Sequence, residues 1–190
     1  RRAFPEDAGK RCMYGAYALA ALLRDAQYPA TIVGGDFLVF TPTVDGQSAG
    51  LHGFGGSTTV GTASHYWVES EKRLVDPSPM MLPLTTSTQI IKPPAIYWPL
   101  DTPFPRYIRY VARMRMSPAA SFSLVPEQCS KADAIVEEFR QQMHGTRTPV
   151  ITKFPVLDGP DYIRRYGAKD KWAHAAARFE DTPSFGEPPF

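Results

Sequence analysis

The stretch "ASHYWVESEKRLVDPSP", residues 63–79, predicts a β-hairpin and with it an antiparallel sheet. Apolar residues alternate with polar ones in an outgoing strand over 64–69 and in a return strand that ends at Asp76. The residues between the strands, 70–72, leave room only for a tight turn. A connection this short requires the two strands to run antiparallel.

Two polar side chains, His65 and Asp76, stand at the open end of this hairpin. Side chains alternate along a strand, so His65 shares a face with Trp67. A turn through 70–72 that pairs residues whose numbers sum to about 141 places His65 opposite Asp76, because 65 plus 76 gives that sum. We therefore expect the imidazole of His65 and the carboxylate of Asp76 to meet across the two strands.

The residues before the hairpin predict a helix, a strand and a loop. In 12–25 apolar residues recur at the spacing of one helical face. The strand expected over 30–40 contains Gly34 and Gly35, which indicate a bulge or a close backbone approach. Residues 45–62 contain six glycines, show no strand pattern and predict a flexible loop that could act as a lid. The apolar face of the helix comprises Cys12, Ala16, Leu19, Ala20 and Leu23.

The residues after the hairpin predict loops, one more strand and several helices. Frequent prolines in 77–105 indicate long ordered loops. Residues 106–116 alternate as a half-buried strand whose polar face carries Arg109, Arg113 and Arg115, which we interpret as a solvated sheet surface. A helix is expected to begin at Pro126, and short helices are expected around Trp172 and Phe179. The first of these helices should bury Ala132, Ile135, Val136, Phe139 and Met143.

This order of elements favours an α+β fold in a single domain over 1–190. The chain has 190 residues, of which 43% are hydrophobic, enough for one substantial core. We expect a core over 11–125, in which the helix packs on an antiparallel sheet. A C-terminal helical extension over 126–182 and a loose proline-rich tail over 183–190 should follow.

The composition disfavours several classes of partner. With 21 basic and 19 acidic residues the net charge is +2, which gives little field for steering nucleic acid. No apolar run reaches the roughly 18 residues of a membrane span, so no membrane partner is expected. Two cysteines are too few for a disulfide framework or a cysteine-rich metal site, which favours a reducing, cytoplasmic setting.

Cys12 has the surroundings of a nucleophile. The thiolate is the reactive form of cysteine, and the unpaired N–H groups of a first helical turn favour an anion there. A histidine can accept the thiol proton if a carboxylate on its other ring nitrogen holds it in the right tautomer. The alternative for each residue alone is structural: Cys12 as a small core side chain, His65 as a hydrogen-bonded core histidine and Asp76 as a turn residue before Pro77.

The segments "CMYGAYALAALLRDAQYPATIVGGDF" (12–37), "HYWVE" (65–69) and "LVDPSP" (74–79) together resemble the core of the transglutaminase-like superfamily. In that pattern, part of the wider papain-like cysteine fold, a cysteine opens a helix that ends in a Gly-hydrophobic-Pro-Ala turn, matched here by "AQYPA" over 26–30. The resemblance, to a bacterial-type member, spans 11–79. It implies a Cys12 nucleophile, a His65 base and an Asp76 orienting group.

The sequence departs from this pattern in three ways. The 53 residues from position 12 to position 65 include the glycine-rich loop, which fills the excess over the family's shorter spacing. Papain's third member, an asparagine, has no counterpart, because the chain contains no asparagine. The glutamine that gives papain-type enzymes an oxyanion donor does not precede Cys12; besides the Cys12 backbone N–H, Tyr14 and Trp67 are the candidates for oxyanion or substrate contacts.

These features predict a cysteine-dependent hydrolase or acyltransferase acting on a peptide, or on a small amide or ester, with no cofactor. Protein cross-linking is disfavoured because no calcium-binding loop is present. Acetyl transfer, as in arylamine N-acetyltransferases, is a nearer rival. The cavity walls are expected from loops 41–62 and 80–105, with Phe54, Tyr97, Trp98 and Phe104 as contributors.

Two other classes stay open. The first is a catalytically inactive binding or scaffold module of the same fold, for which the glycine-rich loop and the arginine face would matter most. The second, a metal hydrolase, is weaker because the four histidines show no paired ligand spacing. The sequence leaves the substrate and the oligomeric state undetermined.

Overall fold

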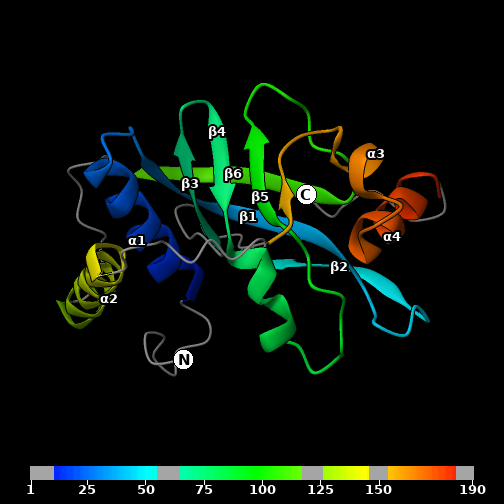
Figure 1. Cartoon of the computed structure of the whole chain (residues 1–190), viewed down its shortest axis with the longest axis horizontal. Coiled ribbons are helices and arrows are strands. Elements are labelled where there is room, and N and C mark those ends of the chain that lie inside the picture. Colours follow the sequence, from blue (N-terminus) through cyan, green and yellow to red (C-terminus); the bar gives the residue numbers. More distant parts are fainter. Residues whose placement is uncertain (1–10, 55–64, 117–125, 146–153, 183–190) are drawn as a thin grey trace.

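The computed structural model describes residues 11–54, 65–116, 126–145 and 154–182. The predicted tail over 183–190 and most of the second half of the glycine-rich loop lie outside these ranges. Within them the fold is mixed α+β, with helices at both ends of a curled, mainly antiparallel sheet (Figure 1).

Seven strands form one sheet in the order β2-β1-β3-β4-β5-β7, and β6 pairs with β1 on its other edge. The long strand β1 makes this branching possible: its first half pairs with β3, its second half with β2, and β6 runs along most of its length. Every pair is antiparallel except β5 with β7. The strands are β1 (Thr31–Pro42), β2 (Ala49–Phe54), β3 (His65–Ser70), β4 (Arg73–Asp76), β5 (Ala95–Pro99), β6 (Ile108–Met116) and β7 (Val156–Leu157).

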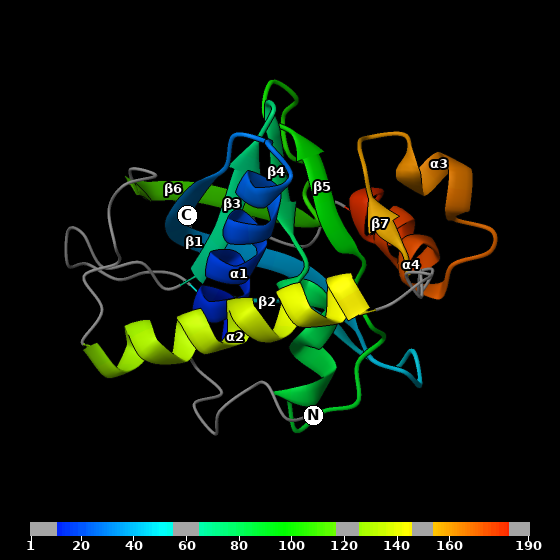
Figure 2. The ribbon, with the colours of Figure 1, turned by 60° about the vertical axis from the view of Figure 1, so that its left-hand side comes forward.

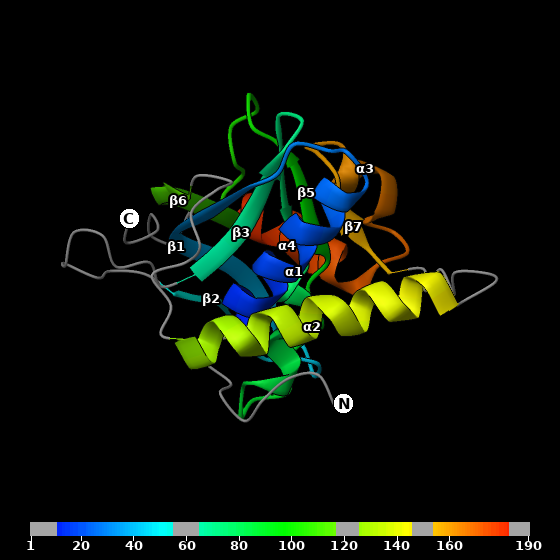
Figure 3. The same cartoon turned by 90° about the vertical axis from the view of Figure 1, so that its left-hand side faces the viewer.

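Two groups of helices cover the sheet. Helix α1 lies against β3, and α2 crosses α1 on the side away from the sheet (Figures 2 and 3). Helices α3 and α4 pack together at the other end, beside β7 (Figure 2). Over the described ranges no helix combines the length and the hydropathy needed to cross a membrane. The helices are α1 (Arg11–Asp25), α2 (Pro126–Gly145), α3 (Tyr162–Tyr166) and α4 (Lys171–Glu180), with a 3-10 helix η2 (Ser78–Leu84) after β4.

The core has two parts, one on each side of β3. Tyr66 and Val68 face α1 and α2, whereas Trp67 faces the curled interior of the sheet. The interior cluster also takes Trp172 of α4, whose indole N–H donates to the carbonyl of Phe40 over 2.8 Å. The C-terminal helices therefore complete the same core as the N-terminal sheet.

The central hairpin is confirmed, with a shifted register. Ser70 pairs with Arg73, so paired residue numbers sum to 143 and not to 141. The turn has two residues, Glu71 and Lys72, with φ of 47° and 62°, the geometry whose twist matches a hairpin. His65 is consequently diagonal to Asp76 and not opposite it. Because the shift is an even number, both side chains still lie on one face, within the reach of diagonal pairs.

The strand over 30–40 and its glycine feature are also confirmed. The register of β1 with β6 shifts between Gly34 and Gly35, which is a β-bulge. A Cβ at Gly35 would lie 2.0 Å from the carbonyl oxygen of Val111, so only glycine allows this approach. The bulge brings Arg113 to the buried carboxylate of Asp36, 2.7 Å away. Arg115 pairs with Glu69 at 3.1 Å, so two of the three arginines of this strand are engaged in ion pairs.

Several sequence expectations were wrong. The glycine-rich segment contains β2, the proline-rich segment 77–105 contains η2 and β5, and the C-terminal segment contributes β7 to the sheet. In α2 the side chain of Met143 is 63% exposed. The short strand β7 pairs with a segment distant in sequence and leaves little local pattern, and the prolines around β5 concealed that strand. In β2, which forms a hairpin with β1, two glycines interrupt the strand pattern. In α1, Met13, Ala16 and Ala20 are buried, whereas Cys12, Leu19 and Leu23 are only half-buried.

Helix α1 ends in a Schellman motif. The N–H of Tyr28 bonds to the carbonyl of Leu23, and the N–H of Gln27 to that of Arg24. Gln27 therefore takes the left-handed conformation, with φ of 66°, at the position where glycine is usual.

Replacing Gln27 with glycine is expected to stabilise the protein by about 1 kcal/mol, because a side chain in the left-handed region costs roughly that much. Urea unfolding measures the change. Gln47→Gly, at an exposed residue of the β1–β2 turn, is the control and should not stabilise. An unchanged or lower free energy of unfolding for Gln27→Gly would contradict this account of the cap.

Candidate active site

His65 and Asp76 form a buried hydrogen-bonded pair at the open end of the β3–β4 hairpin. His65 is the first residue of β3 and Asp76 the last of β4. The Nε2 of His65 lies 2.7 Å from Oδ2 of Asp76. The two residues are 1% and 0% exposed. The meeting of these side chains, predicted from the sequence, is thus present, and burial shields their charges from solvent.

Three donors converge on the Asp76 carboxylate. Besides His65, the hydroxyl of Tyr110 in β6 donates to Oδ2 over 2.7 Å, and the backbone N–H of Ser78 donates to Oδ1 over 2.8 Å. Burial raises the pKa of Asp76, but the charge of His65 and these hydrogen bonds outweigh it and hold the pKa below its usual value. Asp76 is therefore ionised at neutral pH and can only accept hydrogen bonds.

Tyr110 was not identified from the sequence as a site residue. Burial, together with the charge of Asp76, raises its pKa well above the usual value, so the phenol keeps its proton and remains a donor. One signal was available: Tyr110 stands on the apolar face of its strand, where a buried hydroxyl requires a partner. The partner itself depends on the pairing of β6 with β1, which the sequence does not specify.

The pair fixes the protonation of His65. Burial lowers the pKa of His65, but the charge and hydrogen bond of Asp76, with a further contribution from Cys12, raise it to about 9. Because Asp76 only accepts, Nε2 carries a proton in both forms of the ring. The proton that His65 gains and loses on titration is therefore the one on Nδ1. That atom is buried and has no hydrogen-bond partner among the residues the structure describes.

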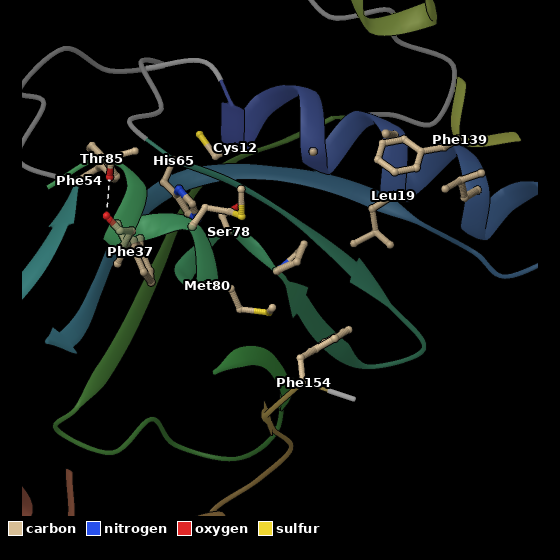
Figure 4. A pocket seen from close by; sticks show the side chains of 16 residues that line it. Cys12, Leu19, Phe37, Phe54, His65, Ser78, Met80, Thr85, Phe139 and Phe154 are labelled. Atoms are coloured by element: carbon tan, nitrogen blue, oxygen red, sulfur yellow. Dashed lines mark hydrogen bonds between the residues drawn. The ribbon is translucent and has the colours of Figure 1, made fainter. Parts of the chain in front are cut away.

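Cys12 lies beside His65, at the start of α1 (Figure 4). Its thiol contributes to the raised pKa of His65. Cys12 is the second residue of α1, so its N–H is one of the four at a helix start that have no intrahelical acceptor. The structure thus brings Cys12 close to the His65–Asp76 pair, in which Asp76 holds Nε2 of the ring.

Aromatic side chains hold the imidazole in place. The ring of Phe37 stacks on His65 with centroids 4.5 Å apart and an angle of 26°. Phe54 and Trp67 lie at 6.2 and 6.3 Å. With Asp76 on one ring nitrogen and aromatic rings around it, the imidazole has a single orientation.

A cavity of about 380 Å³ opens beside Cys12 and His65. Its walls come from one face of α1, from Pro77 and the following η2 helix, and from Phe54 of β2. Phe139 of α2 and Phe154 line the side away from His65 (Figure 4). Of the aromatic residues expected as wall material only Phe54 contributes. Tyr97, Trp98 and Phe104 are not in the lining, because β5 and its neighbours pack elsewhere in the sheet.

Tyr14 and Trp67, the candidates for oxyanion or substrate contacts, do not line this cavity. They are 1% and 2% exposed, and within the described residues neither the Tyr14 hydroxyl nor the Trp67 indole nitrogen has a hydrogen-bond partner. Cys129 and His174 lie outside the cavity lining as well. Across the described ranges no group of three His, Cys, Asp or Glu side chains is arranged to hold a metal ion.

Comparison of the chain with protein-family models, with curated proteins and with solved structures finds no match.

Proposed function

We propose that the protein is a cysteine-dependent hydrolase or acyltransferase with a transglutaminase-like, papain-like fold, in which Cys12, His65 and Asp76 form a triad. The observation that supports this most strongly is the division of roles on the imidazole. One ring nitrogen is held by the Asp76 carboxylate at 2.7 Å, and the other is left for the thiol of Cys12.

The electrostatics suit a thiolate–imidazolium pair. A histidine with a pKa of about 9 is protonated at neutral pH, and a positive ring beside a thiol favours the thiolate. The start of α1 adds its unpaired N–H groups to the same effect. Asp76 stays ionised at Nε2 of the ring, so the carboxylate balances the imidazolium on one side and the thiolate balances it on the other.

The reaction follows from these protonation states. The Sγ of Cys12 forms a bond to the carbonyl carbon of an amide or ester, and the backbone N–H of Cys12 can donate to the oxyanion. The bond to the leaving nitrogen or oxygen breaks, and Nδ1 of His65 gives that group its proton. Water, or an amine in acyl transfer, then attacks the thioester and returns a proton to Nδ1. The C–S bond breaks, and the thiolate is restored.

The proposal is tested by trapping the acyl-enzyme. Brief reaction with 4-nitrophenyl acetate, followed by acid quench and peptide mapping by mass spectrometry, should show an acetyl group on Cys12. Cys129 is the internal control, since it is also half-buried and also lies in the first turn of a helix. The variant Cys12→Ser should give no such adduct.

Two outcomes would contradict the proposal. Equal acetylation of Cys12 and Cys129 would mean that His65 does not activate the thiol. Absence of any adduct on Cys12, with no release of 4-nitrophenol above the spontaneous rate, would favour the alternative of a binding module that keeps the fold without the activity.

A further inference from the structure

The stripe of α1 that begins at Cys12 continues along the cavity. Cys12, Gly15, Leu19 and Leu22 are spaced by three, four and three residues, which places them on one face of the helix, and all of them line the cavity. Leu19 packs in part against the core between α1, α2 and the sheet, but Leu19 and Leu22 both remain half-buried and line the cavity. A groove wall of apolar side chains therefore leads away from the nucleophile.

The rest of the lining is apolar too, except at the catalytic end. Met80, Met81 and Leu82 of η2 face the groove, and Phe139 and Phe154 bound it on the side away from His65 (Figure 4). Apart from Cys12 and His65, no ionisable side chain is among the described residues of the lining. The hydroxyl of Thr85 already donates to the carbonyl of Leu82, and the N–H of Ser78 is taken by Asp76.

From this arrangement we infer that the group transferred to Cys12 is an apolar, unbranched acyl chain that lies along α1. The inference rests on the proposed function and names its substrate class. A peptide strand in the same groove would bury an amide N–H and carbonyl at each residue, and the described lining offers them almost no partners. An acyl chain has its one polar group at the carbonyl, which is where the polar side chains lie.

The dimensions fit a medium-length chain. The helix rises 1.5 Å per residue, so Leu22 lies about 15 Å along the axis from Cys12, the length of an extended chain of about twelve carbon–carbon bonds. The cavity volume of about 380 Å³ is within the range of pockets that take small organic ligands. The flexible side chains of Met80 and Met81 can adapt to such a chain.

The test is a series of 4-nitrophenyl esters from acetate to decanoate, with kcat/KM corrected for spontaneous hydrolysis. Each buried methylene is worth about a fourfold gain, so octanoate should exceed acetate by about 30-fold or more even if only some methylenes are buried. The 4-nitrophenyl ester of N-acetylglycylglycine has a similar length but carries two amides. It should react no faster than the acetate.

One wall variant makes the test specific. A Cβ built at Gly15 meets nothing within 4 Å, so the first carbon of Gly15→Leu has room at this lining position, and leucine is the better helix former. In this variant the ratio of kcat/KM for the octanoate ester to kcat/KM for the acetate ester should fall about tenfold. The matched control is Leu100→Trp, in the turn after β5 and outside the cavity lining, which should keep the wild-type ratio.

Failure of this inference can be told from failure of the proposed function. Acylation of Cys12 by all esters at rates independent of chain length, or faster reaction of the glycylglycine ester than of octanoate, would overturn the acyl-chain inference and leave the triad intact. An unchanged ratio in Gly15→Leu would overturn it as well. The absence of acylation by every ester, acetate included, would overturn the proposed function itself.

Discussion

Replacing His65 with glutamine is expected to lower kcat/KM for 4-nitrophenyl acetate about 100-fold or more at pH 7. The glutamine amide can still donate to Asp76, so the buried carboxylate keeps a partner and the fold is preserved. What is lost is the group that carries a proton between the thiol and the leaving group. Initial rates of 4-nitrophenol release, measured on variants whose circular dichroism matches the wild type, give the comparison.

The control for this substitution is His174→Gln. His174 is exposed on α4 and does not line the cavity. The His174→Gln variant should therefore react at the wild-type rate. If the His65→Gln variant kept more than a tenth of the wild-type rate, or if the two histidine variants lost activity equally, His65 would not be the base of this site.

Replacing Asp76 with asparagine is expected to lower both activity and stability. The amide keeps the volume of the carboxylate but not its charge, so burial dominates and the pKa of His65 falls. The ring is then neutral at pH 7, the thiolate loses its counterion, and kcat/KM should fall about 100-fold. The pair contributes about 3 kcal/mol to the free energy of unfolding, since each unit by which the pKa of His65 is raised from 6.5 to about 9 is worth 1.36 kcal/mol.

The pH dependence of that stability has a definite sign. The folded-state pKa of His65 is raised, so its contribution is complete below pH 6.5 and is lost as the pH rises through about 9. The folded-state pKa of Asp76 is lowered, so its contribution is complete above its ordinary pKa of 3.8 and is lost as the pH falls through the lower folded value. Urea unfolding should therefore show the largest difference in the free energy of unfolding between wild type and Asp76→Asn at pH 5–6, and a small difference above pH 9.

A surface carboxylate serves as the control for this effect. Asp161 forms an exposed pair with Arg164, and the side chains are 66% and 77% exposed. Asp161→Asn should change the free energy of unfolding by less than about 1 kcal/mol at every pH. A gap for Asp76→Asn that stayed constant from pH 5 to pH 10 would contradict the assignment of a charged His65–Asp76 pair.

Much of the site could be predicted because its polar residues stand at the ends of strongly patterned elements. The helix over 12–25 and the hairpin strands have clear periodicities, and Cys12, His65 and Asp76 lie at their termini. The prediction that His65 meets Asp76 required only that the two side chains lie on the same face of the hairpin. This held although the predicted turn length was wrong, because the two-residue turn at Glu71 and Lys72 shifts the register by an even number and leaves each side chain on its predicted face.

The remainder depends on contacts between segments distant in sequence. Tyr110 reaches Asp76 because β6 pairs with the far edge of β1, and β7 completes the sheet by parallel pairing with β5. Neither pairing has a local signature. Leu19 of α1 was interpreted as a core residue because its spacing fits a packed face, but it also lines the cavity. Periodicity shows that apolar residues share one face of a helix. It does not distinguish a face that packs on protein from one that lines a cavity.

The central proposal, that His65 activates Cys12 as the nucleophile, is tested most directly by the rate of alkylation of each thiol as a function of pH. Iodoacetamide labelling of the native protein, followed by peptide mapping, measures Cys12 and Cys129 in the same molecules. Both thiols are half-buried in a first helical turn, so they are compared at similar exposure and at a similar helix position. At pH 6–7 Cys12 should react about tenfold faster or more, and His65→Gln should remove the advantage. Equal and slow labelling of both thiols at that pH would contradict the account.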